Sequence, residues 1–216
     1  MTETDKFDRR KFWRDPAASS CSFSWATHCK PEYYLDLDNV TRLVVSTISK
    51  YCAPNDASIL EIGCGTGRNL VGLVNAGYTN VSGVEISAKA VSVGREQFPE
   101  YRDIDVKVSP IEDIIKSLPE YDVIYTQGCL MHLPYELDWV IEEIKRKAKH
   151  LIMTNEGEPR KGIHVWGRNY EEYITKGGEW AQIEVENGSL YPPLPKTTIK
   201  RVFVRDERNQ SRRGTR

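Results

Sequence analysis

The stretch EIGCGTGRN, residues 61–69, contains three alternating glycines, Gly63, Gly65 and Gly67. Apolar residues stand directly before it and directly after it. Glycine has no Cβ, so the backbone there can turn sharply and come close to a bound molecule. The stretch therefore predicts a ligand-binding loop between a buried strand and a helix.

The same alternation of strand and helix continues along the chain. Short apolar runs predict strands, and apolar residues at three- and four-residue spacing predict helices. Strands are expected at 58–63, 80–87, 105–108, 121–128 and 150–156, and helices at 38–48, 69–75, 88–98, 111–118 and 135–148. Strands that alternate with helices favour right-handed crossovers and a parallel sheet covered on both faces. The fold class is therefore α/β, with a doubly wound sheet.

The alternation ends after residue 156. A helix is expected at 169–176, followed by two strands at 180–187 and 197–204. No helix separates these two strands, so they form an antiparallel hairpin in the simplest interpretation.

The expected organisation is an N-terminal extension at 1–36, a single domain at 37–204 and a polar tail at 205–216. The extension is rich in aromatic residues, which disordered segments usually lack. Its aromatic residues are Phe7, Phe12, Trp13, Phe23, Trp25, Tyr33 and Tyr34. Two interpretations stay open, an extra helix that covers the core and a lid over the ligand.

Composition narrows the class of protein. The 216 residues carry a net charge of -1, which gives no support to a nucleic-acid partner bound by clustered basic charge. The charged N-terminus lacks a signal-peptide core, and no stretch approaches the length of apolar chain that a membrane span needs. A cytoplasmic protein is expected.

The five cysteines include no C-x-x-C pair, which favours reduced thiols over a disulfide framework. Cys21, His28 and Cys29 could serve as metal ligands, but no fourth ligand follows at a recognised spacing. No metal site is expected.

The spacing of the glycine loop narrows the class of ligand. A dinucleotide loop reads G-x-G-x-x-G, whereas here Arg68 occupies the sixth position counted from Gly63. The strand at 80–87 places Glu85 at the carboxyl edge of the sheet, where a carboxylate accepts both hydrogen bonds of a ribose diol. The pattern predicts an adenosine-like ligand without a closely bound pyrophosphate.

The pattern E-x-G-x-G-x-G from Glu61, followed by Glu85 and by YDVIYTQGCLMHLP, resembles the class I S-adenosylmethionine-dependent methyltransferases. The resemblance covers roughly residues 55–156 and extends through the final strand pair. It implies a Rossmann-like seven-stranded sheet in the order 3-2-1-4-5-7-6, with strand seven antiparallel. It also implies S-adenosylmethionine as the cofactor.

The resemblance assigns cofactor contacts by position. Gly63, Gly65 and Gly67 would line the methionine and ribose, Glu85 would hold the ribose, and Glu61 would face the methionine amino group. Gln127 would lie beside the methionine end.

The adenine contact departs from the family pattern. Where the family usually has Gly-Asp-Ala, this chain has Ser109-Pro110-Ile111. The N–H of Ile111 is the expected adenine contact, and Glu112 is the nearest substitute for the missing aspartate.

Two histidines are candidate catalytic bases. A hydroxyl acceptor needs a proton acceptor near the transferred methyl group, whereas an amine needs only to be neutral, and histidine suits the first role at neutral pH. His132 follows the strand at 121–128 and is the stronger candidate. His164 lies in the loop after the strand at 150–156 and is the second.

That loop, NEGEPRKGIHVWGRNYEEY, is rich in charged and aromatic side chains and suits either an acceptor pocket or a surface connection. Together with GCLMHL it is similar to methyltransferases of sugar and glycan biosynthesis, such as the pseudaminic-acid-associated group. A small, polar, sugar-like acceptor is expected, methylated on a hydroxyl or an amine. The pattern does not indicate an oligomeric state.

Other functions stay open. The Asn/Asp-Pro-Pro-aromatic motif of nucleic-acid amino-methyltransferases is absent after the strand at 121–128, which reads Thr126-Gln127-Gly128-Cys129. Gln127 is also not an acidic ligand of the kind that metal-dependent catechol enzymes use there. The missing motif argues against DNA or RNA bases as acceptors, but not against every RNA target. A nucleic-acid methyltransferase, a protein methyltransferase, a nicotinamide dehydrogenase and a cofactor-binding module without turnover are the remaining alternatives.

Overall fold

The computed structural model describes residues 8–15, 30–36, 39–54, 56–158, 161–162, 164–188 and 196–206. Cys21, His28 and Cys29 of the extension lie outside these residues, as do Pro192, Pro193 and Pro195 and the tail from residue 207. Cys52, Cys64 and Cys129 are free thiols. Among the described helices, none has the length and apolar character needed to cross a bilayer.

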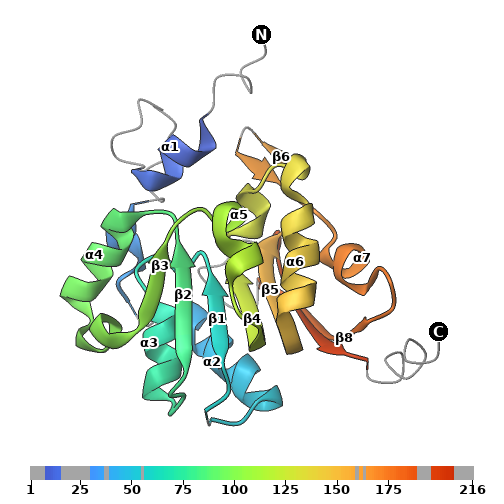
Figure 1. Cartoon of the computed structure of the whole chain (residues 1–216), viewed down its shortest axis with the longest axis horizontal. Helices are drawn as coiled ribbons and strands as arrows, with labels where there is room; N and C mark the ends of the chain where they lie inside the picture. The colour runs from blue at the N-terminus through green and yellow to red at the C-terminus, as the bar shows by residue number, and fades with distance from the viewer. Residues whose placement is uncertain are drawn as a thin grey trace.

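A seven-stranded sheet forms the centre of the molecule, in the order β3-β2-β1-β4-β5-β9-β8 (Figure 1). Its strands are β1 (Ile59–Ile62), β2 (Val81–Glu85), β3 (Asp105–Val108), β4 (Tyr121–Gln127), β5 (Ala148–Gly157), β8 (Trp180–Asn187) and β9 (Thr198–Arg205). The first five pair in parallel, and β9 pairs antiparallel with both β5 and β8. In the order of the seven sheet strands this is 3-2-1-4-5-7-6 with strand seven antiparallel, so the fold expected from the sequence is confirmed.

Helices cover both faces of the sheet. One face carries α2 (Asn39–Tyr51), α3 (Arg68–Asn75) and α4 (Ala88–Gln97), and the other carries α5 (Ile111–Ile114), α6 (Trp139–Lys147) and α7 (Tyr170–Thr175). All four residues of β1 are buried because the strand lies in mid-sheet between the two helical layers. The described residues also form five 3-10 helices: η3 (Pro31–Tyr34), η4 (Pro99–Asp103), η5 (Ile115–Ser117), η6 (Leu130–His132) and η7 (Tyr135–Leu137).

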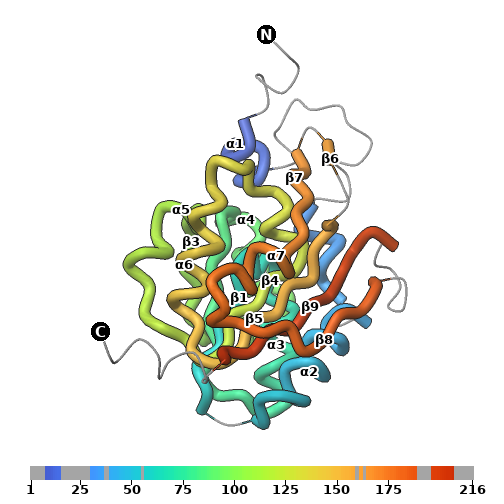
Figure 2. The backbone as a smooth tube through the Cα atoms, turned by 90° about the vertical axis from the view of Figure 1, so that its right-hand side faces the viewer, coloured from blue at the N-terminus to red at the C-terminus, as the bar shows by residue number. Residues whose placement is uncertain are grey.

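Two elements lie near the carboxyl ends of the parallel strands: a helix in the N-terminal extension, whose bounds the sequence did not predict, and a hairpin that was not expected. The helix α1 (Arg9–Arg14) begins after Asp8, whose side chain accepts a hydrogen bond from the backbone N–H of Lys11. A two-stranded hairpin, β6 (Lys161–Gly162) and β7 (Val165–Trp166), follows β5. Figures 1 and 2 both place α1 and this hairpin at the same end of the molecule.

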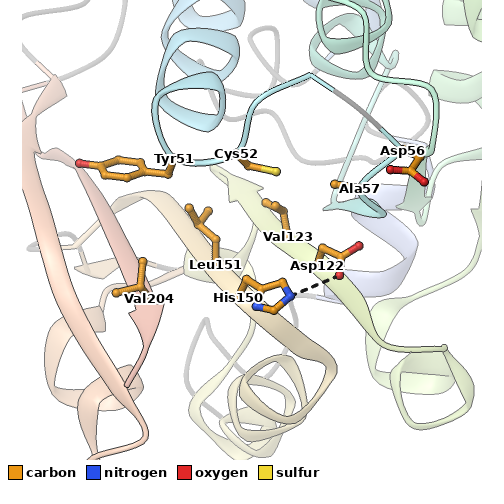
Figure 3. A pocket seen from close by; sticks show the side chains of 9 residues that line it. All are labelled: Tyr51, Cys52, Asp56, Ala57, Asp122, Val123, His150, Leu151 and Val204. Atoms are coloured by element: carbon orange, nitrogen blue, oxygen red, sulfur yellow. Dashed lines mark ion pairs between the residues drawn. The ribbon is translucent and has the colours of Figure 1, made fainter. Parts of the chain in front are cut away.

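The opposite, amino-terminal edge of the sheet has a cavity of about 440 Å³ (Figure 3). Its lining residues are Tyr51, Cys52, Asp56, Ala57, Asp122, Val123, His150, Leu151 and Val204. The side chain of His150 points toward Asp122, with 3.7 Å between Nε2 and Oδ1. This cavity is separated from the glycine loop by the length of β1.

Candidate functional site

The glycine loop leaves β1 at the carboxyl edge of the sheet and enters α3. Its three glycines all have positive φ: 76° at Gly63, 55° at Gly65 and 77° at Gly67. A Cβ on Gly67 would lie 2.2 Å from the ring of Tyr101, whereas a Cβ on Gly65 would meet no atom within 4 Å. Gly65 therefore presents bare backbone to open space, which suits close approach by a ligand.

Glu85 ends β2 directly beside this loop. Its carboxylate accepts a 2.8 Å hydrogen bond from the N–H of Gly65 and another of 2.8 Å from the N–H of Ser87. The residue is 8% exposed, and burial raises the pKa of its carboxyl group, while the two N–H groups oppose this rise. Each oxygen keeps a lone pair beyond these bonds, so the group can also accept from a diol.

Glu61 lies deeper than the sequence suggested. Its carboxylate accepts from the Asn69 side chain at 2.8 Å and from the Tyr125 hydroxyl at 2.9 Å, and the residue is 1% exposed. Burial raises the pKa of Glu61 to about 8, with the two hydrogen bonds acting in the opposite direction. The side chain therefore joins β1, β4 and α3 in a buried polar cluster at the base of the loop.

Ile111 and Glu112 begin α5, after β3. Ile111 is buried. One carboxylate oxygen of Glu112, Oε1, receives the guanidinium groups of Arg9 and Arg10. The other, Oε2, is buried and has no hydrogen-bond partner among the described residues. A buried acceptor without a donor is costly unless a ligand supplies one.

Gln127 is the last residue of β4. Its Oε1 accepts a 2.6 Å hydrogen bond from the side chain of Asn155 on β5. Gly128 follows with φ +60°, and a Cβ on it would meet no atom within 4 Å. The carboxyl ends of β1 and β4 thus present two glycines, Gly65 and Gly128, to open space.

His132 ends η6, the turn that follows β4. Its Nδ1 lies 2.7 Å from the backbone carbonyl of His164. A carbonyl can only accept, so Nδ1 carries the proton and the lone pair of the neutral ring is assigned to Nε2. The rings of His132 and His164 are stacked, with centroids 5.4 Å apart, so the structure brings the two candidate bases together.

The N-terminal segments also reach this edge. Trp13 of α1 lies against His132, with ring centroids 4.4 Å apart. The hydroxyl of Ser87, next to Glu85 along the chain, donates to the backbone carbonyl of Arg14 at 3.0 Å. These residues are functional candidates that sequence reasoning missed, and the aromatic composition of the extension was the one signal that pointed to them.

The charged and aromatic loop after β5 divides into two parts. His164 lies at the edge described above, whereas Glu156, Arg168 and Tyr170 are buried, with exposed fractions of 0%, 4% and 0%. Tyr170 packs into the core. Glu156 and Arg168 therefore do not present their charges to an acceptor.

Known proteins resemble this chain in sequence. Residues 59–150 match a family model described as a methyltransferase domain. EEF1A lysine methyltransferase 2 of Homo sapiens is 26% identical over 122 residues, which are 56% of this chain and 51% of that protein. The Mus musculus protein of the same name is 27% identical over 125 residues, 57% of this chain and 49% of that protein. The chain thus spans about half the length of the curated relatives it matches.

Solved structures extend the likeness over most of the fold. Magnesium protoporphyrin IX methyltransferase from Synechocystis PCC 6803 with bound SAH has a TM-score of 0.67 at 13% identity, covering 91% of this chain and 98% of that chain. TehB from Haemophilus influenzae has a TM-score of 0.60 at 16% identity, covering 77% of this chain and 62% of that chain. At these identities the likeness shows the fold. The family model, the strand order and the glycine loop agree on a methyltransferase domain over residues 59–150, in the fold of the methyltransferase crystallised with SAH.

Proposed function

We propose that this protein binds S-adenosylmethionine at the carboxyl edge of β1, β2 and β4 and transfers its methyl group to a hydroxyl or amine of a small polar, sugar-like acceptor. The cofactor assignment rests on one observation, the hydrogen bond from the backbone N–H of Gly65 to the carboxylate of Glu85. Bare backbone faces open space there, directly beside a buried carboxylate that has lone pairs to spare.

The chain offers a donor or acceptor for each part of the cofactor. Glu85 would accept from the ribose hydroxyls, and Gly63, Gly65 and Gly67 would form the wall beside them. Ile111 would border the adenine. Gln127 would border the methionine end, and Glu61 would support its amino group from beneath the loop.

Glu112 fits the adenine amino group better than the sequence alone suggested. Its buried Oε2 lacks a donor among the described residues, and an exocyclic amine would provide one. The residue would thus supply the acceptor that the absent family aspartate provides elsewhere.

We propose His132 as the proton acceptor for a hydroxyl substrate. The bound cofactor supplies an activated methyl group, so the protein needs only to align the acceptor and remove its proton. The carbonyl of His164 keeps the proton on Nδ1, which gives Nε2 the basic lone pair in the neutral ring. His164 itself stays the second candidate base.

The N-terminal extension acts as a lid in this proposal. Arg9 and Arg10 hold α1 to Glu112, and Trp13 lies on His132. The helix thus touches the proposed adenine end and the proposed base at once. Closing over both would exclude water from the reacting groups.

Calorimetry with S-adenosylhomocysteine, and separately with NAD, tests the cofactor assignment. We expect micromolar or tighter binding of the first and none of the second. Glu85→Gln should weaken binding by about tenfold to a hundredfold, because charge-assisted hydrogen bonds contribute about 1.5–3 kcal/mol each. Glu96→Gln, an exposed change on the neighbouring α4, is the matched control. Binding of NAD alone would overturn the assignment.

A transfer assay tests the acceptor. Methyl-labelled cofactor is incubated with separate metabolite, protein and RNA fractions, and the labelled products are identified by mass. Label in a polar metabolite supports the proposal. Label in a lysine side chain would instead favour a protein acceptor, the class named for the EEF1A relatives. Cofactor binding with no label in any fraction would indicate a binding module without turnover.

The role of His132 has its own test once an acceptor is known. His132→Ala should abolish turnover of a hydroxyl acceptor while the protein still binds S-adenosylhomocysteine, with somewhat faster dissociation because the contact with Trp13 is lost. Full activity of this variant across the pH range would exclude His132 as the base and favour His164 or an amine acceptor.

A further inference from the structure

The buried carboxylate of Glu156 has no part in the proposed chemistry, yet it accepts hydrogen bonds from the turn that carries His132. Its Oε1 accepts from the hydroxyl of Thr126 at 2.8 Å and from the backbone N–H groups of Cys129 at 3.0 Å and Leu130 at 3.1 Å. Its Oε2 accepts from the N–H of Met131 at 3.1 Å. Four donors therefore converge on one side chain.

Three of these donors are consecutive backbone N–H groups. Such a run forms a concave nest that favours an anion, here a side chain of the same chain. A carboxylate satisfies the nest because it only accepts, and bonds to a charged acceptor are stronger than neutral ones. A glutamine of nearly the same shape would turn an NH₂ donor toward at least one of these donors.

A buried cation holds the opposite side of the same turn. Arg168 donates from Nη1 to the carbonyl of Leu130 at 3.3 Å and to the carbonyl of Trp166 at 2.7 Å. Leu130 is thus held through its N–H by Glu156 and through its C=O by Arg168. Because Trp166 belongs to the β6–β7 hairpin, Arg168 also ties the turn to the segment that carries His164.

These contacts determine the position of the His132 ring and its hydrogen bond to the hairpin. His132 follows Met131 directly, and its Nδ1–H depends on meeting the carbonyl of His164. A turn that moved away from the hairpin would lose that carbonyl, and the ring would no longer be restricted to one tautomer. Burying a charge this fully is costly unless hydrogen bonds or an opposite charge offset the lost hydration, as the donors to Glu156 do.

We propose that Glu156 is a positioning residue for methyl transfer, which holds the turn at 128–132 on the end of β5, beside the β6–β7 hairpin, and thereby sets the place and tautomer of His132. The proposal rests on the proposed function, since it gives a role to the setting of His132. Glu156 itself touches neither cofactor nor acceptor in this assignment.

Nitrogen-15 NMR of the histidine rings tests it, because the two neutral tautomers have different ring-nitrogen shifts. The chain has four histidines, and His132→Gln identifies the signal. In the ligand-free wild type we expect His132 as the Nδ1–H tautomer. In Glu156→Gln we expect a mixture of tautomers and a changed ring titration, with S-adenosylhomocysteine affinity within about twofold of wild type. Turnover, where an acceptor is known, should fall in kcat more than in KM.

Glu158→Gln is the matched control. Glu158 is a second largely buried glutamate two residues further along, paired with Arg201 at 2.7 Å rather than with the turn. It should lower stability without altering the His132 signal. If Glu156→Gln does not fold, Thr126→Val, which removes one of the four donors, replaces it and should shift the tautomer ratio in the same direction.

An unchanged His132 tautomer and titration in a folded Glu156→Gln or Thr126→Val protein would overturn the proposal. The ring measurement needs neither cofactor nor acceptor, so its outcome is independent of the cofactor assignment. If the wild-type protein does not bind S-adenosylhomocysteine, that result would instead count against the proposed function.

Discussion

Gly65 and Gly67 lie two residues apart and differ in the room that each leaves for a side chain. Gly67 faces the fully buried ring of Tyr101, whereas Gly65 faces open space. Gly67→Ala should therefore combine left-handed backbone strain with overpacking and lose roughly 2–5 kcal/mol of stability. Gly65→Ala should lose only about 1–2 kcal/mol, the cost of the left-handed backbone.

For ligand affinity we expect the opposite order, with the larger loss in Gly65→Ala. Gly65→Ala places a methyl group where the cofactor is proposed to approach, so it should fold and bind S-adenosylhomocysteine at least about tenfold more weakly. Urea unfolding and calorimetry measure the two properties. Equal binding by wild type and Gly65→Ala would show that the open space at Gly65 is not the ligand side.

Glu61 should make stability fall as pH rises. Its pKa is about 8 in the folded protein and near the ordinary glutamate value, about 4.5, when unfolded. Between these values the folded state holds a proton that the unfolded state has released, so raising pH favours unfolding. The expected loss is roughly 1 kcal/mol per pH unit across this window, with no further loss above about pH 8.

Glu61→Gln should remove this contribution to the pH dependence. Urea unfolding at pH 5.5, 6.5, 7.5 and 8.5 compares the variant with wild type, and the stability difference should move in favour of the variant as pH rises. Glu96→Gln, an exposed change, should follow wild type at every pH. Parallel curves for Glu61→Gln and wild type would mean that Glu61 stays ionised in the folded protein.

Among the described elements, α1 contacts both the proposed adenine end, through Glu112, and the proposed base, His132. Replacing both Arg9 and Arg10 with alanine removes the ion pairs to Glu112 and Asp113. We expect S-adenosylhomocysteine to dissociate about three- to tenfold faster, since partly exposed pairs contribute up to about 1 kcal/mol each. Stopped-flow dissociation measures this change.

Two further variants distinguish a lid from a helix that only covers the core. Lys11→Ala changes an exposed residue of the same helix and should leave dissociation unchanged. Trp13→Ala removes the contact with His132 while leaving Glu112 and its arginines in place, and it should also speed dissociation. A dissociation rate insensitive to all of these changes would make α1 a passive cover.

Elements with a repeating apolar pattern were predictable, and those without one were not. The strands β1, β2 and β4 are short segments rich in apolar residues and bounded by turn residues, so their burial in a parallel sheet was expected. The hairpin β6–β7 has two residues in each strand, too few for any alternation to appear. Its presence changes which residues surround His164.

Buried charges were the second feature that the sequence could not reveal. The sequence placed Glu156 and Arg168 in a loop suited to an acceptor pocket or a surface connection, because glutamate and arginine are usually exposed. Both are instead enclosed, since each finds partners on segments about 25 to 40 residues away in sequence. Contacts of that kind depend on tertiary structure, which local patterns do not encode.

On the scale of the whole molecule, the proposed site and the ion pairs of the edge strand β8 perform separate tasks. Glu184 of β8 pairs with Lys50 of α2 and Lys200 of β9, and the pKa of Glu184 is lowered to about 2, with these partners outweighing burial. These bonds join the late strand pair to the helical layer. The proposed cofactor contacts all lie at the carboxyl edge, so ligand binding should stabilise the domain without involving that network.

Thermal unfolding measures this coupling across the whole molecule. A ligand that binds only the folded state at 100 times its Kd stabilises it by about 2.7 kcal/mol. For a chain of this length that corresponds to a rise in Tm of about 5–10 °C. S-adenosylhomocysteine should produce this rise, and NAD at the same concentration should not. Glu85→Gln should reduce the rise at fixed ligand concentration, because its Kd is larger, while Glu184→Gln should lower the starting Tm and keep the full rise. A Glu184→Gln protein that lost the rise would show that the proposed site is coupled to the ion pairs of β8.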